Sequence, residues 1–200
     1  MFDARARKHI DPALEPIGQW IADKNISANL VTLASLIPAA LAVFALSQQE
    51  YLWAIFFITV NRFLDGLDGV VARINGSTPL GGYLDILCDF AFYVGIPIGF
   101  GLASPDNQMA AILLVAAFTV TGISFLAFAS IAAKHNIKEG EFGEKAFLYT
   151  TGVMEGGETI TFFIAFCFFP AWFTTLASIF AALCLLTVLQ RSFLAYRTFK

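Results

Sequence analysis

The chain has 200 residues, of which 58% are hydrophobic and only 14% are charged, and its mean hydropathy is +0.73. This composition is too apolar for a water-soluble domain of that length. The formal net charge is −3, and we expect no nucleic-acid partner. The sequence predicts an all-α integral membrane protein whose surroundings are the lipid bilayer.

The first 28 residues precede any apolar run, contain Pro12 and Pro16, and do not resemble a cleavable signal peptide. Apolar residues recur in this segment at intervals of three or four, beside Trp20. These positions are Ile10, Leu14, Ile17 and Ile21. We expect residues 1–28 to form a cytoplasmic amphipathic helix in the headgroup plane, and a simple linker is the alternative.

Six stretches are long and apolar enough to cross a bilayer, which takes about 20 residues. They are roughly 29–48, 51–73, 81–102, 108–133, 146–169 and 171–194. Polar residues interrupt the second and the fifth. Residues 29–200 are therefore predicted to form one domain of six transmembrane helices.

Positive charge collects in the loops on the cytoplasmic side of membrane proteins. All Lys and Arg residues except Arg62 lie on one side of the predicted membrane, and the loops near 48–50, 104–108 and 169–171 contain none. The residues on the charged side are Arg5, Arg7, Lys8, Lys24, Arg73, Lys134, Lys138, Lys145, Arg191, Arg197 and Lys200. This distribution predicts a multi-pass protein of a bacterial inner or plasma membrane, with both termini in the cytoplasm.

Four carboxylates fall inside the second and third predicted spans: Asp65, Asp68, Asp85 and Asp89. A lone ionised carboxylate is costly inside a membrane, so cations are expected nearby. Within each pair the residues are three or four apart and share one helix face. A tight turn centred on Ser77 would place Asp68 level with Asp85, and it would place Asp65 level with Asp89. Such a box of oxygen ligands suits Mg²⁺ or Mn²⁺.

The residues around the aspartates form an extended motif. It reads Asp65-x-x-Asp68-Gly69-x-x-Ala72-Arg73, followed by Gly81-x-x-x-Asp85-x-x-x-Asp89. The motif resembles the signature of the CDP-alcohol phosphotransferases, also called CDP-alcohol phosphatidyltransferases, which are integral membrane enzymes of phospholipid head-group synthesis. In that signature eight residues separate the Arg from the Gly. Here seven separate Arg73 from Gly81, and we place the missing residue in the turn.

The resemblance implies transfer of a phosphatidyl or other phosphoalcohol group from a CDP-linked donor, such as CDP-diacylglycerol, to the hydroxyl of a small acceptor alcohol, with release of CMP. It also implies two divalent cations, Mg²⁺ or Mn²⁺, and a homodimer. By this resemblance Asp65, Asp68 and Asp85 are metal ligands, and Asp89 is the general base, close enough to contact a metal as well. Glycerol phosphate, inositol phosphate, serine and choline-like alcohols all remain open as the acceptor.

The resemblance also assigns a cytidine diphosphate site. The positions it implies are Asn29, Thr32, Asp68, Gly69, Ala72, Arg73, Thr78 and Gly81. Small side chains let a nucleotide approach the backbone, and the planar fork of an Arg suits a phosphate. Helix capping is the alternative for Asn29, and close helix crossing is the alternative for the glycines.

Two further carboxylates, Glu155 and Glu158, share one helix face early in the fifth predicted span. They are candidates for binding the hydroxyls of the acceptor alcohol or a cationic acceptor. Ion pairs with Arg62 and Lys145 are the alternative. An acceptor phosphate could be bound by three cations that the positive-inside distribution also explains without a ligand: Lys134, Arg191 and Arg197.

A divalent-cation transporter or channel could also hold carboxylates within its spans. Arg73 argues against it, because an Arg beside the ligands suits a diphosphate and has no use in a cation path. A non-catalytic membrane protein with a degenerate site is the third interpretation, and the presence of all four aspartates argues against that one.

Overall fold

The computed structural model describes residues 2–135 and 152–200, and it describes side chains from residue 12 onward within those ranges. Its helices are α1 (Phe2–Asp23), α2 (Ala28–Ser47), α3 (Tyr51–Asn75), α4 (Pro79–Ala103), α5 (Gln108–Lys134), α6 (Gly156–Phe168) and α7 (Phe173–Phe199). Short 3-10 turns at Pro105–Asn107 and Pro170–Trp172 lead into α5 and α7. The described ranges contain no strand, which confirms the all-α prediction.

Four segments of the described chain are long and apolar enough to cross a membrane. They are Ala28–Ser47, Pro79–Ala103, Pro105–Lys134 and Pro170–Phe199. Helix α3 is long, with 25 residues, but it carries four charged residues, Arg62, Asp65, Asp68 and Arg73. Helix α6 has only 13 residues, and residues 146–151 of the predicted fifth span lie outside the described part, as do Lys138 and Lys145. The chain is a multi-pass membrane protein, and the count of six spans stays a prediction.

The amino-terminal segment is a helix, although it contains Pro12 and Pro16. Helix α1 packs along α3, where Leu14 is buried in a small cluster. The cluster consists of Leu14, Val31, Leu67 and Val70. The helical conformation does not support the linker alternative, and its place in the headgroup plane stays a prediction.

Two polar side chains begin the helices that flank the site. The Ser27 hydroxyl oxygen accepts a hydrogen bond from the Leu30 N–H at 3.3 Å, and this cap begins α2. The Thr78 hydroxyl oxygen accepts one from the Gly81 N–H at 3.0 Å, and Pro79 follows at the first helical position of α4. Both arrangements satisfy backbone donors that would otherwise lack partners at a helix start.

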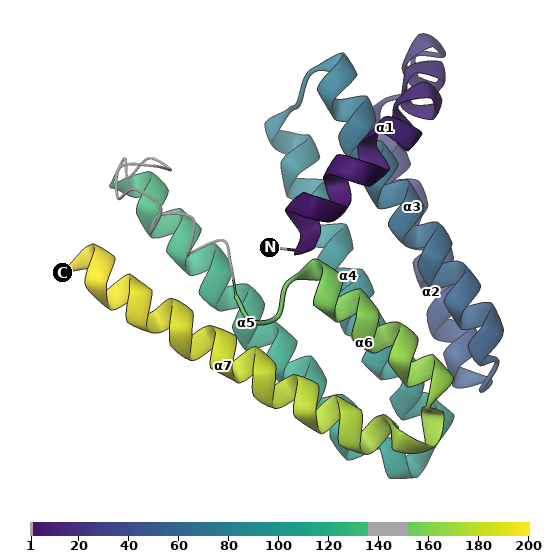
Figure 1. Cartoon of the computed structure of the whole chain (residues 1–200), viewed down its shortest axis with the longest axis vertical. Helices are drawn as coiled ribbons and strands as arrows, with labels where there is room; N and C mark the ends of the chain where they lie inside the picture. The colour runs from purple at the N-terminus through teal and green to yellow at the C-terminus, as the bar shows by residue number, and fades with distance from the viewer. Residues whose placement is uncertain (1, 136–151) are drawn as a thin grey trace.

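Helix α2 packs against both α3 and α4, which approach each other much less closely (Figure 1). The link between α3 and α4 is short, as predicted, and Gly76 within it has a φ of +91°, which a glycine adopts readily. The two helices that this link joins pack mainly against α2 and only slightly against each other. Side chains from α3 and α4 therefore bridge the distance between these helices.

Aromatic side chains form the main core and tie α4 to α6 and α7. The fully buried members are Phe92, Phe100, Phe163, Phe166, Phe173 and Phe180. The rings of Phe100 and Phe173 stack with centroids 4.4 Å apart, a spacing typical of favourable aromatic pairs. Helix α7 also runs alongside α5 (Figure 1). This core gives α4, which carries two of the aspartates, a firm support on one side.

The close contact of α1 with α3 can be tested at Gly18. A Cβ at this position would lie 2.5 Å from Cγ1 of Val70. We expect Gly18→Ala to lower the free energy of unfolding by about 1–3 kcal/mol, because the two helices must separate to relieve the overlap. Thermal unfolding of the detergent-solubilised protein measures this change.

The matched control is Gly82→Ala in α4, where a Cβ would meet nothing within 4 Å. Both substitutions favour the helix to a similar extent, so the difference between them reports the packing of α1. Equal melting temperatures for the two variants would contradict that packing.

Candidate functional site

Three carboxylates converge from two helices. Asp65 lies on α3, and Asp85 and Asp89 lie one turn apart on α4. One oxygen from each can be chosen so that all three lie within 4.8 Å of one another. Asp65 and Asp89 are half-buried, whereas Asp85 is exposed. Oxygen donors of this kind at this spacing fit a hard divalent cation.

The fourth aspartate, Asp68, has a different environment. It is buried and is not part of the group of three. The Thr32 hydroxyl of α2 donates a hydrogen bond to its Oδ2 atom. A buried carboxylate needs such donors. The predicted box of four carboxylates thus consists of three that cluster and one that is bound to α2.

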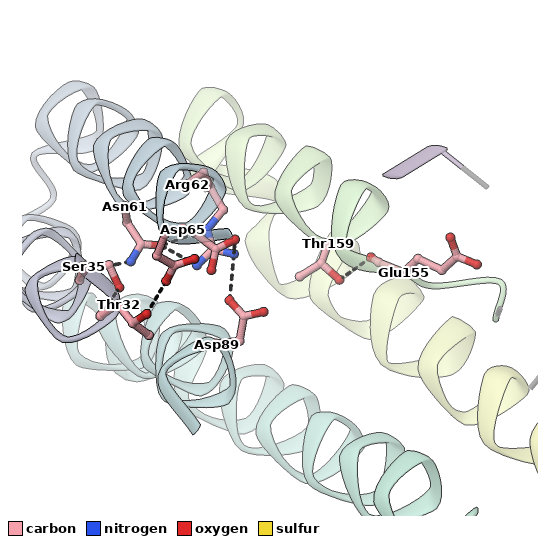
Figure 2. A network of polar contacts seen from close by, with 9 residues as sticks. Thr32, Ser35, Asn61, Arg62, Asp65, Asp89, Glu155 and Thr159 are labelled. Carbon is pink, nitrogen blue, oxygen red and sulfur yellow. Dashed lines mark hydrogen bonds and ion pairs between the residues drawn. The ribbon is translucent and has the colours of Figure 1, made fainter. Parts of the chain in front are cut away.

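Arg62 occupies the centre of the polar network between α3 and α4 (Figure 2). Its Nη1 atom lies 2.9 Å from Oδ1 of Asp89 and 3.4 Å from Oδ2 of Asp65. Asn61 accepts hydrogen bonds from the same guanidinium and donates one to the Ser35 carbonyl of α2 at 2.9 Å. These roles of Arg62 and Asn61 are not among those predicted from the sequence. The spacing of Arg62 three residues before Asp65 was the available signal.

The predicted nucleotide residues at the helix starts lie together. A Cβ on Gly81 would come within 3.0 Å of Asn29 Oδ1 and 3.2 Å of Thr78 Oγ1. Ser27, not Asn29, caps α2, so the capping alternative for Asn29 is wrong. The Thr78 side chain does cap α4, which gives it a structural role.

The other predicted nucleotide residues lie along the last turns of α3. Gly69 and Ala72 are half-buried, and Arg73 is exposed. A Cβ on Gly69 would lie 3.6 Å from Nη1 of Arg73, so the guanidinium extends back over the glycine. With Asn29 and Thr32 on α2, the predicted nucleotide residues come from α2 and from the two helices that pack against it, α3 and α4.

Glu155 and Glu158 form the start of α6. Glu155 is the N-cap residue, and the two side chains make a reciprocal capping box. The Gly152 N–H also donates to Oε1 of Glu155 at 3.2 Å. In Figure 2 Glu155 lies away from the network around Arg62, whose ion pairs are with Asp65 and Asp89 instead. The expectation that both glutamates lie within one helix is wrong, because α6 begins at Gly156 and Glu155 precedes it as the N-cap residue. Such a cap is hard to recognise in a sequence, since Ser, Thr, Asp and Asn are the usual N-cap residues.

The three cations considered for an acceptor phosphate are in different environments. Arg191 is buried, and its Nη1 donates to the Thr121 carbonyl at 3.0 Å and the Ser124 hydroxyl at 2.7 Å. It thereby connects α7 to α5. Arg197 and Lys134 are exposed. The structure does not bring these three side chains to the group of carboxylates through any contact within the described ranges.

Comparison with known proteins gives one family and several relatives. The model of the CDP-alcohol phosphatidyltransferase family matches residues 25–193, a range that includes the four aspartates of the motif and all the predicted nucleotide residues. The chain is 43% identical over 201 residues to the inner membrane protein YnjF of Escherichia coli (strain K12), covering 100% of this chain and 98% of that protein. It is 32% identical over 101 residues to the archaetidylinositol phosphate synthase of Pyrococcus horikoshii, covering 48% of this chain and 54% of that protein.

The contact between Thr32 and Asp68 can be tested by Thr32→Val, which removes the hydroxyl but keeps the shape. We expect the free energy of unfolding to fall by about 1–3 kcal/mol, because Asp68 stays buried and loses a donor. Thermal unfolding in EDTA measures the effect without a contribution from divalent cations.

The control is Thr59→Val. Thr59 is exposed on α3 and donates only to a carbonyl of its own helix, Ile55 O, at 2.8 Å. We expect its melting temperature to stay close to that of the parent protein. Equal effects of the two substitutions would show that the hydroxyl of Thr32 does not stabilise the carboxylate.

Proposed function

The chain belongs to the CDP-alcohol phosphatidyltransferase family, and we propose that it transfers a phosphatidyl or other phosphoalcohol group from a CDP-linked lipid donor, such as CDP-diacylglycerol, to the hydroxyl of a small alcohol. The observation that carries this proposal is the convergence of Asp65, Asp85 and Asp89 beside the motif residues of α3. A transferase in phospholipid synthesis fits both the family and the apolar helices.

We assign the group of carboxylates to two divalent cations, Mg²⁺ or Mn²⁺. The donor set supports this, because three carboxylates from two helices present oxygens at ligand spacing. Asp68, the remaining motif aspartate, would complete the set from its place beside Thr32. When bound, a pair of such cations neutralises a diphosphate and the departing oxygen.

Asp89 is proposed as the general base. It accepts the proton of the acceptor hydroxyl, and the resulting oxygen forms a bond to the phosphorus that carries the transferred alcohol. The bond from that phosphorus to the CMP oxygen breaks, and CMP leaves with the electron pair. The half-buried position of Asp89 on α4, next to the other two carboxylates, supports this role because the proton acceptor must lie close to the reacting phosphate.

The nucleotide would lie against the starts of α2 and α4 and the end of α3. Asn29 and Thr32 offer hydrogen-bonding groups for the base or ribose, and the exposed Arg73 is placed to meet a phosphate. Gly69, Ala72 and Gly81 would let the nucleotide approach the backbone. Asp68 and Thr78 complete the proposed set.

The acceptor alcohol is the least constrained part of the proposal. Glu155 and Glu158 remain candidates for binding it, and their capping box gives both a structural task as well. The relative from Pyrococcus horikoshii is an archaetidylinositol phosphate synthase, which makes inositol phosphate one alcohol to include among the candidates.

We further propose that residues 29–200 form a six-span domain with both termini in the cytoplasm, and that residues 1–28 lie along the membrane surface. The relative from Escherichia coli is an inner membrane protein, which supports the same location for this chain. A homodimer is proposed from the family resemblance.

The reaction can be tested with purified protein, Mn²⁺ or Mg²⁺, CDP-diacylglycerol and a panel of alcohols. We expect release of CMP that depends on both the donor and one alcohol. Asp89→Asn should reduce its rate by at least roughly 100-fold, because the base is lost. Asp106→Asn, which changes an exposed carboxylate after α4, should leave the rate unchanged. Full activity of Asp89→Asn would rule out the base assignment.

Metal removal provides a second test of the site. Dialysis against EDTA should abolish CMP release, and added Mn²⁺ or Mg²⁺ should restore it, because the diphosphate and the carboxylates repel each other without cations. Asp85→Asn should raise the Mn²⁺ concentration needed for half-maximal activity. Activity that persists in EDTA would contradict the metal assignment.

The cation-transporter alternative makes a different prediction. It requires uptake of a divalent cation into proteoliposomes and no binding of CDP. Binding of CDP that depends on Arg73, without metal uptake, would exclude it.

A further inference from the structure

We propose that Arg62 is a built-in counter-cation of the carboxylate group. Its positive charge compensates Asp65 and Asp89 in the metal-free protein, and the same charge lowers the affinity of the group for divalent cations. This inference rests on the proposed function, because it takes the three clustered carboxylates to be the cation site.

The contacts place the guanidinium against two of the three carboxylates. Nη1 lies 2.9 Å from Oδ1 of Asp89 on α4 and 3.4 Å from Oδ2 of Asp65 on α3. One nitrogen therefore bridges both helices, as Figure 2 shows. The Arg62 side chain is only 17% exposed, so water screens these pairs less than it screens an ordinary surface ion pair.

Neighbouring side chains hold the guanidinium in this position. Asn61 Oδ1 accepts hydrogen bonds from Nε at 2.8 Å and from Nη2 at 2.6 Å. The guanidinium carbon also lies 4.3 Å from the ring centroid of Phe92 and 5.6 Å from that of Tyr93, within the range of cation–π attraction. Nη1 is the nitrogen that these contacts leave for the aspartates. The guanidinium thus has a built site of its own.

The charges explain why a counter-cation is needed. Three carboxylates with oxygens within 4.8 Å repel one another strongly at the low effective dielectric of a helix bundle. A positive charge between two of them reduces that repulsion when no metal is bound. A divalent cation that enters the group meets the like charge of Arg62 at similar range, so its affinity is lower than the carboxylates alone would give.

The charge and the shape of Arg62 can be separated by two substitutions. Arg62→Gln removes the charge, whereas Arg62→Lys keeps it and removes the planar fork. If the charge is what matters, Arg62→Lys behaves like the parent protein. If Arg62 only orients the aspartates through its hydrogen bonds, Arg62→Lys and Arg62→Gln lose function in the same way and both bind metal more weakly.

The experiment is a titration of the full-length protein in detergent with Mn²⁺, followed by electron paramagnetic resonance of the free ion. We expect Arg62→Gln to bind Mn²⁺ at least about tenfold more tightly than the parent, and Arg62→Lys to bind within about threefold of it. The control is Arg191→Gln, which removes another buried guanidinium whose hydrogen bonds go to a hydroxyl and a carbonyl. Its Mn²⁺ affinity should not change.

Thermal unfolding gives a readout that does not depend on activity or on metal. In EDTA, Arg62→Gln should melt at a lower temperature than the parent, and added Mn²⁺ should raise its melting temperature more. If Arg62→Gln does not fold in EDTA, the double variant Arg62→Gln/Asp65→Asn removes one charge of each sign and should recover a folded protein. No recovery in the double variant would overturn the inference.

The outcomes separate this inference from the proposed function. Saturable Mn²⁺ binding with equal or weaker affinity in Arg62→Gln would overturn the counter-cation role and leave the metal site standing. Equal tightening in Arg62→Lys and Arg62→Gln would also overturn it, because the charge would then not be the cause. No saturable binding by any variant would overturn the metal site of the proposed function, and the inference with it.

Discussion

Ionised carboxylates remain inside an apolar helix bundle only where donors or cations surround them, and the polar half of this structure is organised by that requirement. Asp68 is buried and receives the hydroxyl of Thr32. Asp65 and Asp89 share the guanidinium of Arg62, and Asp85 is exposed. The requirement is thus met in three ways, by a hydroxyl donor, by a shared guanidinium and by exposure, and residues of one motif have different environments.

Helix α2 contacts the polar residues around the aspartates, although it carries none of the aspartates itself. Its Thr32 hydroxyl reaches Asp68, and its Ser35 carbonyl accepts a hydrogen bond from Asn61, which in turn holds Arg62. Because α2 packs against both α3 and α4, these contacts fix the position of the polar residues relative to α2. Separately from this network, α4 packs against α6 and α7 through the aromatic core.

Much of this arrangement could be predicted from sequence, because helical spacing is local. The intervals of three and four residues placed each pair of aspartates on one face, and the polar residues near Ser77 marked a short link between helices. The separation of Asp68 from the other three could not be predicted, since it depends on how α2 packs against α3 and α4. The ion pair of Arg62 with Asp89 was not predicted either, because it also depends on how helices pack: Asp89 is 27 residues away along the chain. Glu155 lacked a recognisable capping signature.

The position of Arg62 also affects two properties of the proposed metal site: its affinity for cations and the stability of the protein when no cation is bound. A group of carboxylates that is tuned only for cations would be unstable whenever those cations are absent. A group whose charge is fully neutralised by arginines would not bind divalent cations. A single guanidinium bridging two of three carboxylates leaves the group with excess negative charge. On the proposed function, the group would remain folded without metal and would still attract it. The balance between these demands depends on the number of fixed charges, and here it is set by one residue of α3.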